Sequence, residues 1–169
     1  MIKKVGRAGI FFLGFILAAF FICVVAQGFN SDRYYLIIAR HSGKCLDVRD
    51  RSDNDGATIQ QWECHGGENQ RFRLAPVSNG QYQIRVKQSD KCFDVSGGSQ
   101  ENGATIIQYS CHDGANQRFW VNDIGNGYYT IEAVHSGKCL DVRNGSTDNG
   151  EIIHQWECVG VNNQQWEIR

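Results

Sequence analysis

Apolar and polar residues alternate along most of this chain in short runs that are bounded by glycine, asparagine or aspartate. Successive side chains of a strand point to opposite faces, so such runs predict short strands with one face on a core. The first four strands are expected at residues 35–39, 45–49, 58–63 and 72–74. The loop before the third run ends in Asp55-Gly56, a dipeptide that favours a tight hairpin turn.

The same pattern occurs three times at a fixed step of 47 residues. Segment 41–48 returns as the related segments 89–95 and 135–142, with a cysteine and an aspartate in register each time. A fixed period of this length indicates one supersecondary unit used three times. Each unit is too small to bury its own apolar face. The sequence therefore predicts an all-β fold in which twelve strands close into one barrel with threefold pseudo-symmetry.

The N-terminal residues follow a different pattern. Three cationic residues, Lys3, Lys4 and Arg7, precede an apolar run that ends at Val24-Val25-Ala26. This combination predicts a signal peptide over residues 1–26 that is cleaved after Ala26, and hence a secreted protein. The run is also near the minimum length for a membrane span, so an uncleaved anchor formed by residues 8–26 stays open as the alternative.

Cleavage would leave a chain of one-domain size. We expect a short N-terminal segment, residues 27–34, and one domain over residues 35–169, with repeats at 35–79, 80–126 and 127–169. Three of the 17 basic residues and none of the 18 acidic residues precede residue 27, which leaves 14 against 18 and a net charge of −4. A mildly acidic surface without a basic run argues against nucleic acid as a partner. We expect a monomer.

The cysteines beyond residue 26 form three pairs, each 19 residues apart within one repeat. Six cysteines allow fifteen pairings, and the repeat favours a disulfide inside each copy: Cys45–Cys64, Cys92–Cys111 and Cys139–Cys158. Metal binding is the competing interpretation, because His65 and His112 each follow a cysteine. Neighbouring strand residues face opposite ways, and Val159 stands at this place in the third copy. We therefore expect neither a metal site nor a cofactor.

The repeated motifs resemble those of a known family. Each copy has a Cys-Leu-Asp-Val type segment, a hairpin, a Gln-aromatic-x-Cys segment and an Asn-Gln-x-aromatic segment, as in Gln61-Trp62-Glu63-Cys64 and Asn69-Gln70-Arg71-Phe72. This pattern resembles the ricin B-chain type lectins, in particular the carbohydrate-binding modules attached to bacterial xylanases. The resemblance covers residues 35–169. It implies a β-trefoil that binds sugars in up to three shallow pockets.

The residues themselves favour the same chemistry. Leu46 and Val48 are expected to face the core, which places Asp47 on the outer side of its strand and makes it a surface acceptor for sugar hydroxyls. Ile59 has the parity of a core residue, so Trp62 is expected outside, free to stack on a sugar ring. An asparagine amide both donates to and accepts from hydroxyls. We assign the glutamine that follows it, Gln70 in the first copy, mainly to structure.

The resemblance implies that these positions contact sugar in each copy. The predicted sugar-binding residues are Asp47, Trp62, His65 and Asn69 in the first copy, Asp94, Tyr109, His112 and Asn116 in the second, and Asp141, Trp156 and Asn163 in the third. Val159 replaces the histidine in the third copy, so the first pocket is expected to bind most strongly and the third to differ most in sugar preference.

Two rival classes of function remain to be weighed. A glycosidase needs two carboxylates about 5–10 Å apart, but Glu63, the acid beside the aromatic, becomes Ser110 in the second copy. No arrangement suggests a nucleophile with its base, so we expect a non-catalytic protein. The alternative is a secreted trefoil that binds a protein partner through its loops, as an inhibitor or toxin subunit would.

Overall fold

The computed structural model describes residues 28–169. The predicted signal peptide and the alternative membrane anchor both lie outside the described residues. Within residues 28–169, no helix is long and apolar enough to cross a bilayer. In this part of the chain the regular elements are twelve strands, as the alternating pattern predicted, joined by short 3-10 turns.

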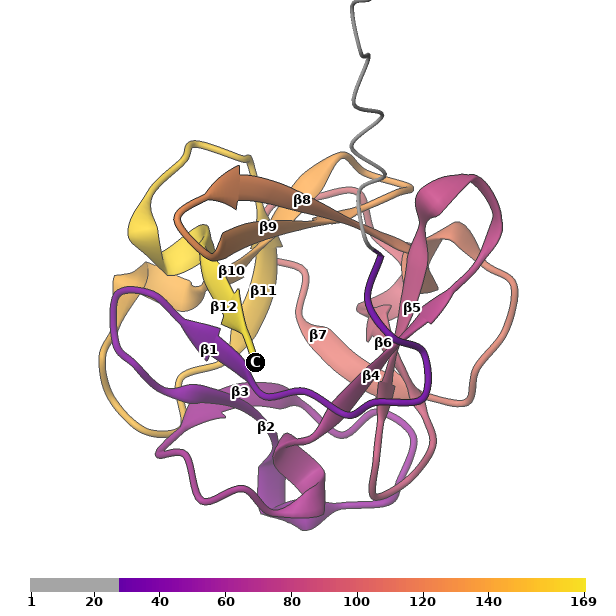
Figure 1. Ribbon diagram of the computed structural model, residues 1–169, viewed down its shortest axis with the longest axis horizontal. Helices are drawn as coiled ribbons and strands as arrows, with labels where there is room; N and C mark the ends of the chain where they lie inside the picture. The colour runs from indigo at the N-terminus through magenta and orange to yellow at the C-terminus, as the bar shows by residue number, and fades with distance from the viewer. Residues whose placement is uncertain (1–27) are drawn as a thin grey trace, which may run out of the picture.

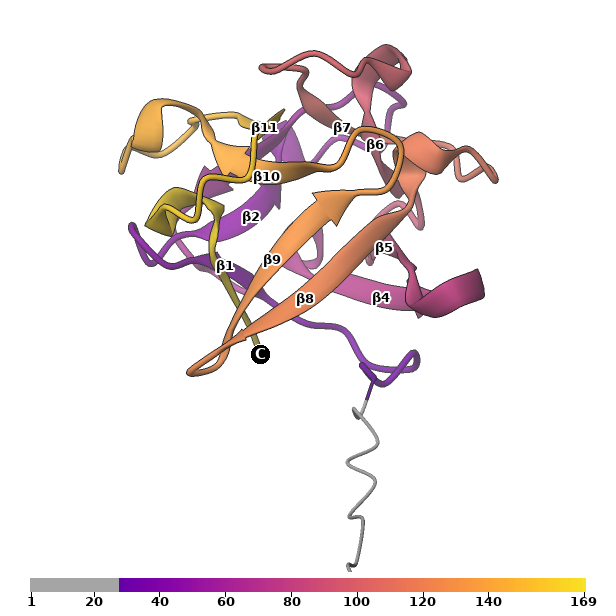
Figure 2. The ribbon, with the colours of Figure 1, turned by 90° about the horizontal axis from the view of Figure 1, so that it is seen from above.

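Six strands form a closed barrel (Figures 1 and 2). They are β1 (Ile37–Ala39), β4 (Phe72–Pro76), β5 (Tyr82–Val86), β8 (Phe119–Gly125), β9 (Tyr128–Ala133) and β12 (Trp166–Ile168). All pairings are antiparallel, in the order β1, β12, β9, β8, β5 and β4. An isolated bridge between Tyr35 and Phe72 joins β4 back to the start of β1 and completes the ring. A closed barrel leaves no unpaired sheet edge.

The other six strands form three hairpins at one end of the barrel (Figure 2). They pair as β2 (Cys45–Val48) with β3 (Ile59–Trp62), β6 (Cys92–Val95) with β7 (Ile106–Tyr109), and β10 (Lys138–Val142) with β11 (Ile153–Trp156). Single bridges link the hairpins to one another, such as Thr58 to Ile107 and Thr105 to His154. A six-stranded barrel with three hairpins is the predicted β-trefoil, and the fold prediction is confirmed.

Seven short 3-10 turns lie between the strands. They are η1 (Arg49–Arg51), η2 (Glu68–Gln70), η3 (Ser78–Gly80), η4 (Ser96–Gly98), η5 (Ala115–Gln117), η6 (Arg143–Gly145) and η7 (Asn162–Gln164). Six of them form two sets of three equivalent turns: η1, η4 and η6 follow the first hairpin strand of each repeat, and η2, η5 and η7 precede the last strand of each repeat. These two sets of turns form part of each candidate site.

One core fills the barrel and the space beneath the hairpins. Its largest members are Phe72, Phe93, Phe119 and Trp166, all fully buried. Three of these are the aromatic residues that close the Asn-Gln-x-aromatic segments, so the change from phenylalanine to tryptophan in the third copy is a packing difference. Leu46, Val48 and Ile59 are buried too, which confirms the predicted core face of the first hairpin.

Three buried glutamines, one in each hairpin, connect that hairpin to a loop of another repeat. Gln61 Nε2 donates to the backbone oxygens of Ser146 and Asp148, 2.8 and 2.9 Å away, while its Oε1 accepts from Ser42. Gln108 and Gln155 make the equivalent bonds in the other repeats. Buried amides with all their partners present stabilise one specific arrangement. The glutamine before each exposed aromatic therefore has a structural function that the sequence did not reveal.

The N-terminal segment is packed against the barrel. Phe29 lies between Tyr35, Tyr82 and Tyr129, with ring centroids 5.6, 5.8 and 5.3 Å away. These tyrosines stand 47 residues apart and occupy equivalent places in the three repeats. One aromatic side chain from outside the repeats thus contacts all three of them. In Figure 2 the N-terminal segment enters at the end of the barrel opposite the hairpins.

Candidate functional site

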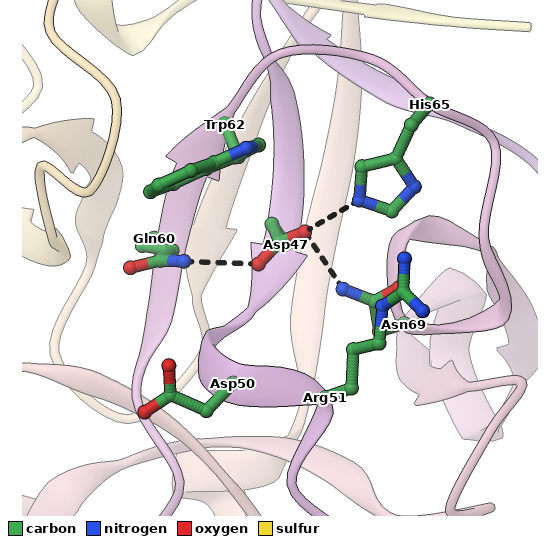
Figure 3. Close-up of a pocket in the computed structure, with 7 residues that line it drawn as sticks. All are labelled: Asp47, Asp50, Arg51, Gln60, Trp62, His65 and Asn69. Atoms are coloured by element: carbon green, nitrogen blue, oxygen red, sulfur yellow. Dashed lines mark hydrogen bonds and ion pairs between the residues drawn. The ribbon is translucent and has the colours of Figure 1, made fainter.

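Among residues 28–169, three equivalent surface pockets occur, one in each repeat, and each gathers the predicted residues of its own repeat. The first is lined by Asp47, Asp50, Arg51, Gln60, Trp62, His65 and Asn69 (Figure 3). The second and third are built from the equivalent segments of their repeats, around Asp94 and Asp141. The structure therefore brings together all eleven residues that the sequence singled out, in three groups.

The expected exposure of the aspartates is wrong. Asp47, Asp94 and Asp141 are only 3, 4 and 5% exposed. Strand alternation does place them opposite the core face, since Leu46 and Val48 on either side of Asp47 are buried in the core. The reason for the burial is that a second segment of the same repeat, η2 in the first copy, packs over the outer side of the strand and covers the carboxylate.

Side-chain amides surround the carboxylate of Asp47. Asn69 Nδ2 and Gln70 Nε2 donate to its Oδ2 at 2.7 and 3.0 Å, and Gln60 Nε2 donates to its Oδ1 at 3.0 Å. Gln70 also donates to the backbone oxygen of Glu63 and accepts from the backbone of His65, which confirms its structural assignment. A carboxylate can accept about four hydrogen bonds. Part of the acceptor capacity of Asp47 is thus used within the protein and part is left for a ligand.

The exposed aromatics are placed as predicted. Trp62, Tyr109 and Trp156 are 39, 43 and 41% exposed, and each lies at the last position of a hairpin strand beside its pocket. Large rings that remain half exposed above buried polar groups are suited to stacking on the apolar face of a sugar ring. Figure 3 shows the indole of Trp62 beside the carboxylate of Asp47.

The histidines of the first two pockets are held in one orientation. The backbone N–H of Gly67 donates to His65 Nδ1 at 3.1 Å, and that of Gly114 donates to His112 Nδ1 at 2.9 Å. A neutral imidazole whose Nδ1 accepts carries its proton on Nε2. In His65 this nitrogen lies 3.5 Å from Asp47 Oδ2, so it faces the carboxylate at the edge of the pocket (Figure 3).

The residue thirteen positions after each aspartate was missed by the sequence analysis. It is Gln60 in the first pocket, Ile107 in the second and His154 in the third, each opposite its aspartate on the neighbouring strand. Gln60 and His154 occupy Oδ1 of their aspartates at 3.0 Å. Ile107 offers no polar group, and Oδ1 of Asp94 accepts no hydrogen bond from the described residues. Pairing the two strands of each predicted hairpin in register would have identified this position from the sequence.

The turn after the first hairpin strand also distinguishes the pockets. Asp50 and Arg51 line the first pocket with backbone φ of 57° and 51°, a left-handed conformation that favours glycine. Gly97 and Gly98 occupy the same places in the second pocket. The cavity volume is about 240 Å³ in the first pocket and about 490 Å³ in the second. The first pocket is thus the smaller of the two, and its lining includes two charged side chains, one of them a second carboxylate.

The three disulfides join the predicted partners. Cys45–Cys64, Cys92–Cys111 and Cys139–Cys158 each connect the first hairpin strand to the loop that follows the second. That loop carries the pocket histidine in the first two repeats, so the bridge helps to fix it. Across residues 28–169, no three histidine, cysteine or acidic side chains are gathered as metal ligands would be.

A comparison with known protein families matches residues 33–166 to the ricin-type beta-trefoil lectin domain. The chain belongs to this family. Membership supports a carbohydrate-binding role for the domain, and it agrees with the pocket geometry described above. The family includes domains that are joined to enzymes as well as separate lectins, so the role of the domain and the activity of a whole protein are distinct questions.

Similar proteins include a designed molecule, an enzyme and an invertebrate clotting protein. The designed threefold symmetric ThreeFoil is 45% identical, with a TM-score of 0.79 over 80% of this chain and 96% of its own. An exo-β-1,3-galactanase of Clostridium thermocellum is 41% identical, with a TM-score of 0.78 over 80% of this chain and 29% of its own. The clotting factor G alpha subunit of Tachypleus tridentatus is 47% identical over 53 residues, which is 31% of this chain and 8% of that protein.

Proposed function

We propose that this protein is a secreted, non-catalytic lectin with up to three shallow sugar-binding pockets. The observation that carries the proposal is the threefold recurrence of one arrangement: an exposed aromatic ring beside a buried aspartate that is held by an asparagine. Trp62, Asp47 and Asn69 form it in the first pocket, at distances described above. Membership of the ricin-type lectin family supports the same reading.

The pocket chemistry suits a pyranose. The aromatic ring covers the apolar C–H face of the sugar, and the free lone pairs of the aspartate accept from its hydroxyls. His65 and His112 add an Nε2 donor in the first two pockets. Because amides of the same repeat already hold each carboxylate in place, little conformational entropy is lost when a hydroxyl binds to it.

Each pocket is shallow, so the affinity for a single sugar is low. Hydroxyls exchange water for protein with small net gain, and we expect dissociation constants from millimolar to high micromolar, about 4–6 kcal/mol. The pockets are distributed around the hairpin end of the molecule, and a branched or surface-bound glycan that reaches two of them would bind about 10²–10⁴-fold more tightly. Glycans or polysaccharides are therefore the proposed partners, with the first pocket strongest.

The first pocket contains two carboxylates, yet its arrangement supports binding over catalysis. Both oxygens of Asp47 already accept from side-chain amides that fix the carboxylate in one orientation, which suits it to accept from the hydroxyls of a bound ligand. Asp50 has no acidic equivalent in the other pockets, where Gly97 and Asn144 stand at this position. Secretion rests on the N-terminal pattern and on three disulfides, which persist in oxidising compartments.

The experiment is glycan-array and polysaccharide binding by the protein and by aromatic variants. Trp62→Ala, Tyr109→Ala and Trp156→Ala remove exposed rings and should leave the fold intact. Each single variant is expected to weaken binding to a multivalent glycan, and the triple variant to abolish it. Ile124→Ala is the matched control, because Ile124 is similarly exposed on β8 and lines none of the three pockets.

Two outcomes would overturn the proposal. Full glycan binding by a folded triple variant would end the site assignment. A blank array for the wild-type protein, together with a protein partner recovered by pull-down, would favour the loop-mediated alternative. Equal affinity for free monosaccharide and for the polymer would refute the multivalent part alone.

A further inference from the structure

The third pocket has an apolar wall that the other two lack. Val159 and Val161 are 59 and 45% exposed and line the pocket next to Trp156. The equivalent positions are His65 and Gly67 in the first repeat, and His112 and Gly114 in the second. Apolar side chains that remain exposed next to a polar binding site gain free energy when a ligand covers them.

The two valines form a coupled replacement. A Cβ on Gly67 would meet His65 Cε1 and Asn69 Oδ1, both at 2.8 Å, so a side chain at position 67 would force the imidazole and the Asn69 amide to shift. The backbone does not require glycine there, since Gly67 and Val161 have φ of −64° and −79°. Val159 removes the imidazole ring, and this leaves room for the side chain of Val161. The third repeat therefore has a different but complete pocket wall.

The polar part of the third pocket is retained. Asn163 Nδ2 and Gln164 Nε2 donate to Asp141 Oδ2 at 3.0 and 2.9 Å. His154 Nε2 lies 3.0 Å from Asp141 Oδ1, and the imidazole stacks on Trp156 with a centroid distance of 5.5 Å and an interplanar angle of 25°. The carboxylate is thus held by side-chain amides, as in the other pockets, Trp156 is held by the stacked imidazole, and the apolar wall is added to them.

We infer that the third pocket selects a hexose that carries a methyl group, as an acetamido sugar or a 6-deoxy sugar does. This inference rests on the proposed function, because it assumes that Trp156, Asp141 and Asn163 bind a pyranose. The methyl group would lie against Val159 and Val161. Burying one such group is worth a factor of about four in affinity, and a hexose with only hydroxyls would leave the two valines exposed.

The test uses a protein in which only the third pocket is intact, the Trp62→Ala/Tyr109→Ala variant. Calorimetry or NMR titration compares galactose and glucose with their N-acetamido derivatives, and galactose with 6-deoxygalactose. We expect at least one methyl-bearing sugar to bind about fourfold or more tightly than its parent hexose. The acetamido and deoxy arms show which source of the methyl group is preferred. Shifts of the valine methyl signals on binding would place the ligand at the wall.

Two further variants of that protein serve as controls. Val159→Thr/Val161→Thr keeps the shape of both side chains but replaces one methyl group of each by a hydroxyl. Val159→His/Val161→Gly restores the residues found at these positions in the first two repeats. Both are expected to bind the parent hexose and to lose the preference. Equal affinity for parent and derivative before these changes, or no sugar binding by the isolated third pocket while the wild type binds, would overturn the inference. Absence of glycan binding by the wild type itself would instead refute the proposed function.

Discussion

Replacing Asp47 by alanine removes the acceptor of three side-chain amides at once. Gln60, Asn69 and Gln70 donate to it at 3.0, 2.7 and 3.0 Å. A hydrogen bond to a charged group contributes about 1.5–3 kcal/mol to stability. In the variant, water can enter the space left by the carboxylate and accept from the three amides, so the net loss is about 1 kcal/mol for each hydrogen bond. Asp47→Ala is therefore expected to lower the free energy of unfolding by about 3 kcal/mol.

Asp94→Ala is the comparison within the same molecule. Within residues 28–169, only the side chains of Asn116 and Gln117 donate to Asp94, at 3.0 and 2.8 Å, so the expected loss is about 2 kcal/mol. Urea unfolding followed by tryptophan fluorescence, with the disulfides intact, measures both. The corresponding fall in Tm for Asp47→Ala is about 10 °C in a domain of this size. A loss below about 0.5 kcal/mol, or a larger loss for Asp94→Ala than for Asp47→Ala, would refute the reasoning.

Three other predictions concern the core, the disulfides and the effect of pH. Trp166 Nε1 is buried without a partner among the described residues. Trp166→Phe should change the free energy of unfolding by less than about 1 kcal/mol in denaturant titration, because removal of the unpaired N–H offsets the lost packing. Trp166→Ala should lower the free energy of unfolding by about 3–5 kcal/mol. Cys92→Ser/Cys111→Ser opens a loop whose two ends lie 19 positions apart in the sequence. It should lower the free energy of unfolding by about 3 kcal/mol, and an unchanged midpoint would contradict this. A hydrogen bond from Lys91, with others from Ser110, holds the pKa of Asp55 below its ordinary value of 3.8. The stabilisation is present above that value and is lost as pH falls through the lower folded-state pKa, so the parent should exceed Asp55→Asn in Tm at pH 7, and a difference that persisted in strong acid would contradict the assignment.

The fold could be predicted because the same pattern of strands and motifs recurs three times in the sequence. A single run such as residues 45–48 is compatible with many sheets, but three copies at one spacing leave few closed arrangements. The same repetition identified the three disulfides among fifteen possible pairings. The exposure of Trp62 followed from parity, since Ile59 on the same strand had to face the core.

The burial of the aspartates could not be predicted in this way. The alternation of side chains along a strand predicts on which side of the strand Asp47 lies, but it does not predict which segment packs onto that side. That depends on the path of the chain between Cys64 and Phe72, which contains no regular pattern. Gln60 was missed for a related reason: its contact with Asp47 depends on hairpin register, which is set by the turn geometry at residues 49–57.

The position of Phe29 has a consequence for engineering this molecule. Its three tyrosine partners are repeated, but Phe29 is not, so one side chain breaks the threefold symmetry at the barrel end. A chain assembled from three identical copies of residues 35–79 would leave those tyrosine faces without a partner. A circular permutant with new termini in another inter-repeat loop would need a linker, in addition to residues 28–34, that returns Phe29 to the same place. Comparing the free energies of unfolding of such permutants would show how much Phe29 contributes to the stability of the threefold fold.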